Sequence, residues 1–195
     1  MYEHLRGNIA ELGPAFAVLD CNGIGFGLHL SLHTYAQLPQ TGEVKLWVHP
    51  VYREDTQLLF GFADKEEREV FRLLIGVSGI GPNTARVVLS SMSPSEVVQA
   101  LATGDPAAFK HVKGVGPKIA QRLVVELRDK VGRLPGSASF PSLGSGQPSV
   151  FDEALQALEV LGYPRAAADK AVRSALALQP EATTGELVKI SLKTL

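Results

Sequence analysis

The sequence has a single cysteine, Cys21, among its 195 residues. One cysteine excludes an internal disulfide and a cluster of cysteine metal ligands, and it is typical of proteins kept in a reducing compartment. The chain also has no run of 18 apolar residues that could cross a membrane, and its N-terminal residues have no apolar signal core. We therefore expect a cytoplasmic protein without membrane contact, in which Cys21 is a small apolar strand residue rather than a nucleophile.

The five histidines form no recognisable metal-binding motif. The motif HExxH is missing, and only His29 and His33 are four residues apart. These two lie in a run that we interpret as a strand, where such side chains do not converge as they do on a helix. The chain also lacks the P-loop pattern GxxxxGK[ST], so any ATP hydrolysis would need another protein. We expect no metal, no cofactor and no catalytic residue.

The formal net charge of −1 conceals an uneven distribution of charge. Residues 1–63 hold 3 basic and 6 acidic side chains, whereas residues 64–135 hold 11 basic and 8 acidic ones. Residues 136–195 are nearly neutral, with 5 basic and 6 acidic side chains. Most of the excess positive charge lies between Phe109 and Arg133. Such a local basic segment is typical of proteins that bind nucleic-acid phosphates.

Residues 1–63 have the pattern of a small β-barrel. Short runs such as FAVLD, FGLHLSL, VKLWVHPVY and QLLFGF alternate apolar and polar residues or are rich in aromatic and β-branched types. Turn sequences such as Cys21-Asn22-Gly23 separate them. Five or six short strands in about 60 residues favour a closed barrel, because closure leaves no exposed strand edge.

Residues 64–134 change to a helical period. Asp64-Lys65-Glu66-Glu67 predicts a capping box at the start of a helix. Pro82 and Pro117 occupy positions suited to the first residue of a helix, where the missing N–H has no cost. Ser93 is expected to begin another helix and Gly104 to end it. The segment is therefore predicted to form two successive helix–turn–helix units.

Residues 135–149 separate this segment from a C-terminal module. Of these 15 residues, 11 are Pro, Gly or Ser, which predicts a flexible linker. Residues 150–195 have the pattern of three short amphipathic helices, broken at residues 161–164 and near residues 179–180. The whole chain is thus expected to be an α+β protein made of a barrel, a helical DNA-binding domain, a linker and a small three-helix domain.

The same glycine turn occurs twice in the helical segment, at an offset of about 35 residues. The first copy, VSGIGP, contains Gly79 and Gly81, and the second, VKGVGP, contains Gly114 and Gly116. Glycine at both positions of a turn allows φ > 0 and leaves the backbone open to a ligand. The N–H groups at the start of the next helix then form an anion site that a DNA phosphate fits without any base contact. A turn that only joins two packed helices is the alternative; two aligned copies with basic flanks favour phosphate binding.

Four side chains after the glycine turns are further candidates for phosphate contact. Lys118 lies in the first turn of its helix and Arg122 lies one turn later, so both can reach the same DNA strand. Asn83 stands where the second copy has Lys118, which makes the first copy the weaker one. Arg86 follows Asn83 by about one turn and restores part of the missing charge. We predict that these four residues bind DNA phosphates together with the four glycines.

The chain resembles the RuvA family over nearly its whole length. The shared motifs are Arg6-Gly7, NGIGF at Asn22 to Phe26, RED…LFGF from Arg53 to Phe62, VSGIGP, KGVGPK, and LxxLGY at Leu158 to Tyr163. The resemblance implies an OB-fold barrel, a tandem helix–hairpin–helix domain and a UBA-like C-terminal domain that binds the ATPase RuvB. It also implies a non-enzymatic homotetramer, or an octamer, that binds four-way (Holliday) junctions and holds them open and square.

On this resemblance, the protein serves branch migration in homologous recombination, DNA repair and the SOS response to DNA damage. Its partners would be the junction, the RuvB-like ATPase and a junction resolvase in the same complex, at the bacterial nucleoid. Leu158, Leu161, Tyr163 and Leu192 are the residues expected to bind the ATPase. Core packing is the alternative for these four side chains, and some of them are expected to serve it. A 15-residue linker would let the C-terminal domain reach a motor while the rest stays on DNA.

Glu54 and Asp55 lie between two predicted strands, in a segment short enough to be a hairpin tip. Considered alone, they are most simply a solvated turn. A metal-binding or catalytic pair is a weaker interpretation, because no other acidic residue or histidine clearly completes it. The resemblance implies a different role, an acidic pin at the centre of a four-fold assembly. Four copies of the pair would repel phosphates from the axis and help to separate strands at the crossover.

Two other classes of function remain open from the sequence. A structure-specific nuclease or repair-enzyme subunit could use the same turns, but it needs a carboxylate cluster for metal-assisted hydrolysis, and only Glu54 and Asp55 are available. A sequence-specific regulator is disfavoured, because neither glycine turn is followed by an evident base-reading surface.

Overall fold

The computed structural model describes residues 2–132 and 149–195. The chain divides between residues 139 and 140 into two units, an N-terminal one with strands and helices and a C-terminal one whose described part, residues 149–195, is helical. No helix in the described ranges has the length and apolar character needed to cross a membrane.

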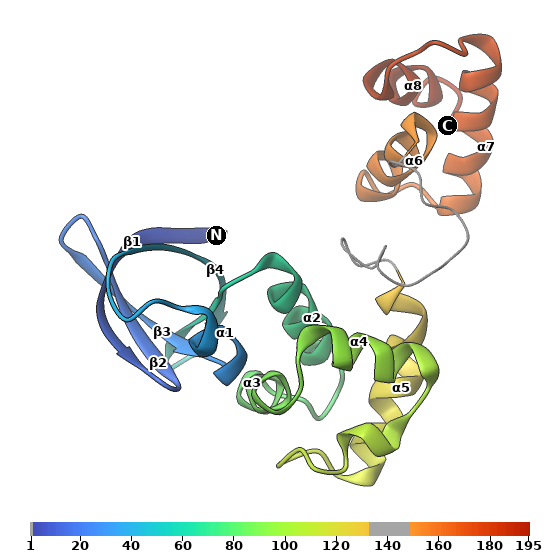
Figure 1. Ribbon diagram of the computed structural model, residues 1–195. Coiled ribbons are helices and arrows are strands. Elements are labelled where there is room, and N and C mark those ends of the chain that lie inside the picture. Colours follow the sequence, from blue (N-terminus) through green and yellow to red (C-terminus); the bar gives the residue numbers. More distant parts are fainter. Residues whose placement is uncertain (1, 133–148) are drawn as a thin grey trace. The chain divides into compact units, whose positions relative to one another are not determined.

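Five strands of the N-terminal unit form a closed barrel (Figure 1). They are β1 (His4–Gly13), β2 (Phe16–Cys21), β3 (Ile24–Leu30), β4 (Glu43–Tyr52) and β5 (Gln57–Phe62), with the short helix α1 (Leu32–Gln37) between β3 and β4. The order around the barrel is β1-β2-β3-β5-β4, and β3 pairs with β5 in parallel while the other pairs are antiparallel. A five-stranded Greek-key barrel of this kind is an OB-fold, so the predicted barrel is confirmed.

The barrel interior is filled by side chains from alternate positions of the strands. The buried residues are Leu5, Ala17, Leu19, Leu28, Leu30, Leu46 and Val48. Gly7 is required by close packing, because a Cβ atom there would lie 2.2 Å from the carbonyl oxygen of Asp20. Cys21 ends β2 half-buried against this core, and burial raises the pKa of its thiol. This agrees with its interpretation as a small apolar strand residue.

The strand predicted through FGLHLSL ends earlier than expected. β3 stops at Leu30, and the hydroxyl of Ser31 accepts a 2.9 Å hydrogen bond from the N–H of Thr34, which caps α1. His33 therefore lies on a helix while His29 remains in the strand, so the prediction of one strand for both histidines was wrong. The cause is local, because a serine cap competes with strand pairing.

The helices of the N-terminal unit follow the barrel directly. They are α2 (Lys65–Ile75), α3 (Pro82–Ser91), α4 (Pro94–Thr103), the 3₁₀ helix η1 (Pro106–Phe109) and α5 (Pro117–Val131). Pro82 and Pro117 are first residues of helices, as predicted. Ser93 caps α4 in a capping box, and Gly104 ends α4 in the left-handed region with φ of 76°. The second predicted helix–turn–helix differs from a simple one, because the 3₁₀ helix η1 lies between α4 and the second glycine turn.

The capping box predicted at Asp64 forms only in part. Asp64 accepts a 2.6 Å hydrogen bond from the N–H of Glu67 and so caps α2. The side chain of Glu67 does not return to Asp64 but accepts hydrogen bonds from the hydroxyls of Ser31 and Thr34. The helix packs against the barrel at this point, and the carboxylate is used for that contact instead.

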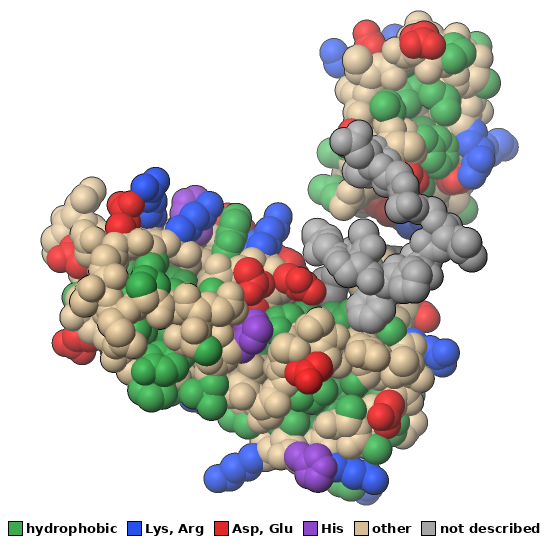
Figure 2. Space-filling model, viewed as in Figure 1, with side chains coloured by type: hydrophobic (Ala, Val, Ile, Leu, Met, Phe, Trp, Pro, Cys, Tyr) green, Lys and Arg blue, Asp and Glu red, His purple; other side chains and the backbone are tan. Residues whose placement is uncertain are grey.

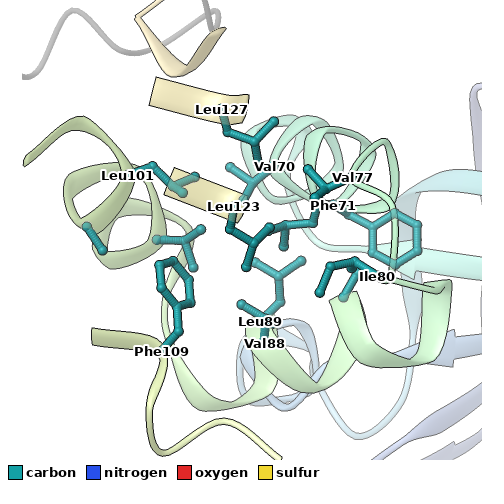
Figure 3. Close-up of a cluster of buried hydrophobic side chains, with 14 of the residues drawn as sticks. Val70, Phe71, Val77, Ile80, Val88, Leu89, Leu101, Phe109, Leu123 and Leu127 are labelled. Atoms are coloured by element: carbon teal, nitrogen blue, oxygen red, sulfur yellow. The ribbon is translucent and has the colours of Figure 1, made fainter. Parts of the chain in front are cut away.

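A single apolar core holds the helices together and reaches into the barrel. Figure 3 shows side chains of α2, α3, α4, η1 and α5 pointing toward one another, among them Phe71, Leu89, Phe109 and Leu123. Phe60 and Phe62 of β5 belong to the same buried cluster. The barrel and the helical segment, predicted as separate domains 1–63 and 64–134, therefore pack as one unit.

The C-terminal unit contains three helices with breaks where they were predicted. They are α6 (Val150–Val160), α7 (Arg165–Leu178) and α8 (Thr184–Ser191). Their buried residues are Ala154, Leu155, Leu158, Ala168, Val172, Ala175 and Leu187. The predicted linker 135–149 lies outside the described residues except for Ser149, which caps α6 in a capping box with Asp152.

Candidate nucleic-acid interface

The two glycine turns have nearly the same backbone geometry. Gly79 and Gly114 have φ of +96° and +90°, a region that residues with side chains rarely adopt. Gly81 and Gly116 have φ of −86° and −79°, which any residue can adopt. The expectation that glycine at both positions serves φ > 0 is therefore wrong for the second glycine of each turn.

The second glycine of each turn keeps the backbone open instead. A Cβ atom on Gly81 or Gly116 would have no neighbour within 4 Å, so a side chain there would project into free space. Both glycines are N-caps without a side-chain hydrogen bond to the helix they begin. The N–H groups in the first turns of α3 and α5 thus face outward without a capping side chain. They provide the donors that an anion needs.

The two turns also pack against each other's helices in a reciprocal way. A Cβ atom on Gly79 would lie 3.8 Å from Ile119, the third residue of α5. A Cβ atom on Gly114 would lie 3.6 Å from Thr84, the third residue of α3. The repeat in the sequence therefore places the two glycine turns, which are the candidate anion sites, next to each other.

The predicted arginines are tied to main-chain carbonyl groups. Arg122 donates a 3.0 Å hydrogen bond from Nη1 to the carbonyl oxygen of Ser78 in the first glycine turn. Arg86 donates a 3.1 Å hydrogen bond from Nη1 to the carbonyl oxygen of Ala15, which lies between β1 and β2. Each guanidinium has further N–H donors that these bonds do not use. The two arginines connect elements of the fold in addition to lying near the candidate surface.

Lys118 and Asn83 occupy equivalent positions as the second residues of α5 and α3, and both are exposed. Lys110 and Lys113 are exposed as well, on the segment that leads from η1 into the second turn. Figure 2 shows Lys, Arg and His side chains along the lower edge of the N-terminal unit, where the chain passes from η1 into α5 in Figure 1. The second turn is therefore the more basic of the two.

Glu54 and Asp55 form the tip of the hairpin between β4 and β5, as predicted. The N–H of Arg53 donates a 2.9 Å hydrogen bond to the carbonyl oxygen of Thr56, which closes the turn. Both carboxylates are exposed, and among the described residues neither has an ion-pair partner. No ion pair within the described residues therefore neutralises either carboxylate. Its role as a pin remains a prediction.

A second acidic group escaped the sequence analysis. One ligand-type atom from each of His33, Asp64 and Glu67 lies within 4.8 Å of the others. Glu67 is fully buried, and burial raises the pKa of its carboxyl group, although hydrogen bonds from Ser31 and Thr34 act in the opposite direction. No local pattern pairs residue 67 with residues 31 and 34, because the contact depends on how α2 packs on the barrel.

The residues predicted to bind an ATPase differ in accessibility. Leu158 is fully buried in the core of the C-terminal unit, so it is unavailable to a partner and its assignment is corrected to core packing. Tyr163 is half-buried against the same core. Leu161 and Leu192 are 59% and 39% exposed. Val160 and Leu178, which the sequence analysis did not select, are more exposed still, at 82% and 75%.

Comparison with known families and proteins gives one consistent result. Residues 1–61 match the RuvA N terminal domain, residues 71–129 the SAM-like helix-hairpin-helix tandem, and residues 149–195 the RuvA C-terminal domain. Proteins named Holliday junction branch migration complex subunit RuvA from Christiangramia forsetii and Bacteroides fragilis are each 44% identical to this chain over 100% of both sequences. The protein of that name from Chlorobaculum tepidum is 40% identical over 98% of this chain and 96% of its own length. The chain therefore belongs to the RuvA family.

Proposed function

We propose that this protein is the non-catalytic, DNA-binding subunit of a branch migration complex and that it recognises four-way junctions. The observation that carries the proposal is the pair of outward-facing, uncapped helix N-termini behind the two glycine turns. Each N-terminus can bind one phosphate of a DNA strand by donating hydrogen bonds to it, and this contact is independent of base sequence. The names of the full-length relatives support the same function.

In this proposal the acidic tip restricts which DNA is bound. Glu54 and Asp55 repel phosphates, so continuous duplex is disfavoured at the tip while the open centre of a junction is tolerated. A homotetramer, or two tetramers facing each other, would bring the tips together at the crossover and hold the junction open and square. The exposure of both carboxylates and their lack of ion-pair partners among the described residues support this role.

The C-terminal unit is proposed to recruit the RuvB-like ATPase. Its exposed apolar side chains at Val160, Leu161, Leu178 and Leu192 are the natural docking residues. Because the chain has no P-loop, the motor must supply the energy for strand movement. A junction resolvase acting on the same complex would complete the pathway for recombination and repair at the bacterial nucleoid.

The proposal is tested by gel shifts with a four-way junction and a linear duplex of matched sequence, across a range of salt concentrations. We expect marked preference for the junction and affinity that falls steeply with salt, because phosphate binding releases counterions. Equal affinity for the two DNAs would reduce the protein to a general phosphate binder. The nuclease alternative is tested by adding Mg²⁺ to the same junction, and cleavage by the purified protein would contradict a non-catalytic role.

A further inference from the structure

Helix α2 joins the acidic tip to the glycine turns. β5 runs from the tip to Phe62, α2 begins at Lys65, and the first glycine turn follows α2 from Val77. The way α2 is seated on the barrel therefore determines where the first turn lies relative to Glu54 and Asp55. Three side chains of α2 make the contacts that seat it.

The first contact is made by Glu67. Its buried carboxylate accepts hydrogen bonds from the hydroxyls of Ser31 and Thr34 at the start of α1, the latter at 2.5 Å. Thr34 Oγ1 in turn accepts a 3.1 Å hydrogen bond from the N–H of Ala63, just before α2. The start of α2 is thus bound to α1 through directional bonds.

The second contact is made by Arg68, the next residue along. Its Nη1 donates to the carbonyl oxygen of Glu3 at 2.9 Å and to the carboxylate of Glu3 at 2.6 Å. The guanidinium also lies 5.0 Å from the ring centroid of Trp47 on β4, and its Nη2 donates to Glu69 at 3.0 Å. Arg68 therefore binds α2 to Glu3, the residue before β1, and to β4, whereas Glu67 binds α2 to the start of α1.

The third contact is apolar. The ring of Phe71 lies 5.1 Å from that of Phe60 and 5.0 Å from that of Phe62, measured between centroids. At about 100° per residue, Phe71 lies between Glu67 and Arg68 around the axis of α2, about 40° from the first and about 60° from the second. Apolar contacts alone would allow α2 to rotate or slide, but polar contacts on either side of Phe71 prevent both movements.

Stability alone does not explain this arrangement. Burying charged groups is costly, and an apolar pair of similar volume is often as stabilising. Arg68 even leaves its buried Nε without a hydrogen-bond partner within the described residues. Directional contacts differ from apolar ones in that they allow only one orientation.

We propose that Glu67 and Arg68 are positioning residues that hold the glycine turns at a fixed place relative to the acidic tip, and that this fixed placement gives the preference for junctions over duplex. The inference rests on the proposed function. A DNA strand can satisfy both turns while avoiding the tip only if their separation is constant. If α2 could rotate, the turns would still bind phosphate, but they would accept duplex and junction alike.

The first experiment measures the placement without DNA. Spin labels are attached to cysteines introduced at Thr56 in the tip and Ser78 in the first turn, in a Cys21→Ser background, and distances are recorded by pulsed electron resonance. We expect a narrow distance distribution in the parent protein and a broad one in Glu67→Ala and Arg68→Met. Glu67→Gln, whose amide oxygen can accept from one hydroxyl while its NH2 group donates to the other, should restore the narrow distribution. The control is Glu66→Ala, which removes an exposed charge from the same helix.

The second experiment measures DNA affinity in the same variants without labels. Glu67→Ala and Arg68→Met should lower junction affinity at least tenfold, while duplex affinity stays within about threefold. The reason is that a variable distance between the glycine turns and the acidic tip weakens only the binding of the junction, which must fit both at once. Glu67→Gln and Glu66→Ala should keep the parent ratio. If Glu67→Ala does not fold, Ser31→Ala replaces it, since that change removes one hydroxyl donor to Glu67 together with the cap of α1 and leaves the bond from Thr34 in place.

The outcomes separate the inference from the proposed function. Unchanged distance distributions in both disruptive variants would overturn the positioning role. Broadened distributions with an unchanged junction-to-duplex ratio would overturn the link to specificity. A parent protein without junction preference would overturn the proposed function and that link together, whereas the distance measurement would still decide whether Glu67 and Arg68 fix α2.

Discussion

Arg122 on α5 donates a 3.0 Å hydrogen bond to the carbonyl oxygen of Ser78 in the first glycine turn. The helix that follows the second turn is therefore bonded to the backbone of the first. Together with the packing of Gly79 against Ile119 and of Gly114 against Thr84, this bond connects the two turns directly. Arg122, which was predicted from the sequence to contact phosphate, therefore also connects parts of the fold.

Arg122→Ala is expected to weaken DNA binding in two ways, by removing a cation and by loosening the first turn. Hydrogen exchange at residues 77–81 should become faster in this variant without DNA, because the carbonyl of Ser78 loses its partner. Lys118→Ala is the matched control: it removes one exposed cation of the same helix and should leave that exchange unchanged. Equal exchange rates in both variants would show that the bond to Ser78 does not brace the turn.

The two glycines of the second turn are expected to respond differently to alanine. Gly114→Ala forces a side chain into a backbone with φ of +90° and should lower the free energy of unfolding by about 1–3 kcal/mol. Gly116→Ala has an ordinary φ of −79° and open space, so stability should change little while DNA affinity falls, because the methyl group occupies space through which a phosphate would approach the backbone. Thermal unfolding and gel shifts measure the two effects. Equal stability of the two variants would contradict the backbone assignment.

Asn83→Lys should strengthen the weaker of the two turns. Asn83 is exposed as the second residue of α3, the position that Lys118 holds in α5. If a phosphate binds there, the added lysine raises the magnitude of the slope of log affinity against log salt by about 0.9. Lys118→Ala should lower the slope by a similar amount. An unchanged slope in Asn83→Lys would mean that the first turn does not contact phosphate in the complex.

The sequence predicted the parts of this fold that depend on local chemistry. Pro82 and Pro117 begin helices and Gly104 ends one, because proline and glycine restrict or free the backbone wherever they occur. The acidic tip at Glu54 and Asp55 was likewise predictable, since two recognisable strands lie on either side of it.

What the sequence could not predict depends on contacts between distant segments. The partners of Glu67 lie more than 30 residues away at Ser31 and Thr34, so the expected capping box formed only in part. Leu158 and Leu161 both fit a helical apolar pattern, yet packing of the three helices buries the first and exposes the second. Tertiary packing, which single-sequence patterns do not report, decided both cases.

Glu67 should give stability a distinctive dependence on pH. Burial raises the pKa of its carboxyl group above the ordinary value of 4.5, so the folded state holds the proton more tightly than the unfolded state. Its contribution to stability is present in full below pH 4.5 and is lost as the pH rises through the raised pKa. Glu67→Gln lacks this ionisation but keeps a polar group of the same shape, with one oxygen that accepts from a hydroxyl and an NH2 group that can donate to the other.

The measurement is the free energy of unfolding in urea for the parent protein and Glu67→Gln across the acidic to neutral range. Glu3 and Glu96 have lowered pKa values because of their bonds to Arg68 and Ser93, and they add stability as pH rises, but they do so in both proteins. The free energy of unfolding of the parent protein minus that of Glu67→Gln should therefore become more negative with rising pH. A difference that stays constant would show that Glu67 titrates normally in the folded protein.

Leu158 and Leu161 offer a matched test of the C-terminal unit, because they are the same residue type three positions apart. Leu158→Ala empties a fully buried site and should lower the stability of this unit by about 2–5 kcal/mol. Leu161→Ala, at a 59% exposed site, should unfold like the parent protein but bind the RuvB-like ATPase more weakly. Calorimetry reports the first effect and ATPase pull-down the second. If Leu161→Ala bound the ATPase normally, Leu161 would not be part of the docking surface, and the proposed contact would have to be made by other exposed apolar side chains of the C-terminal unit.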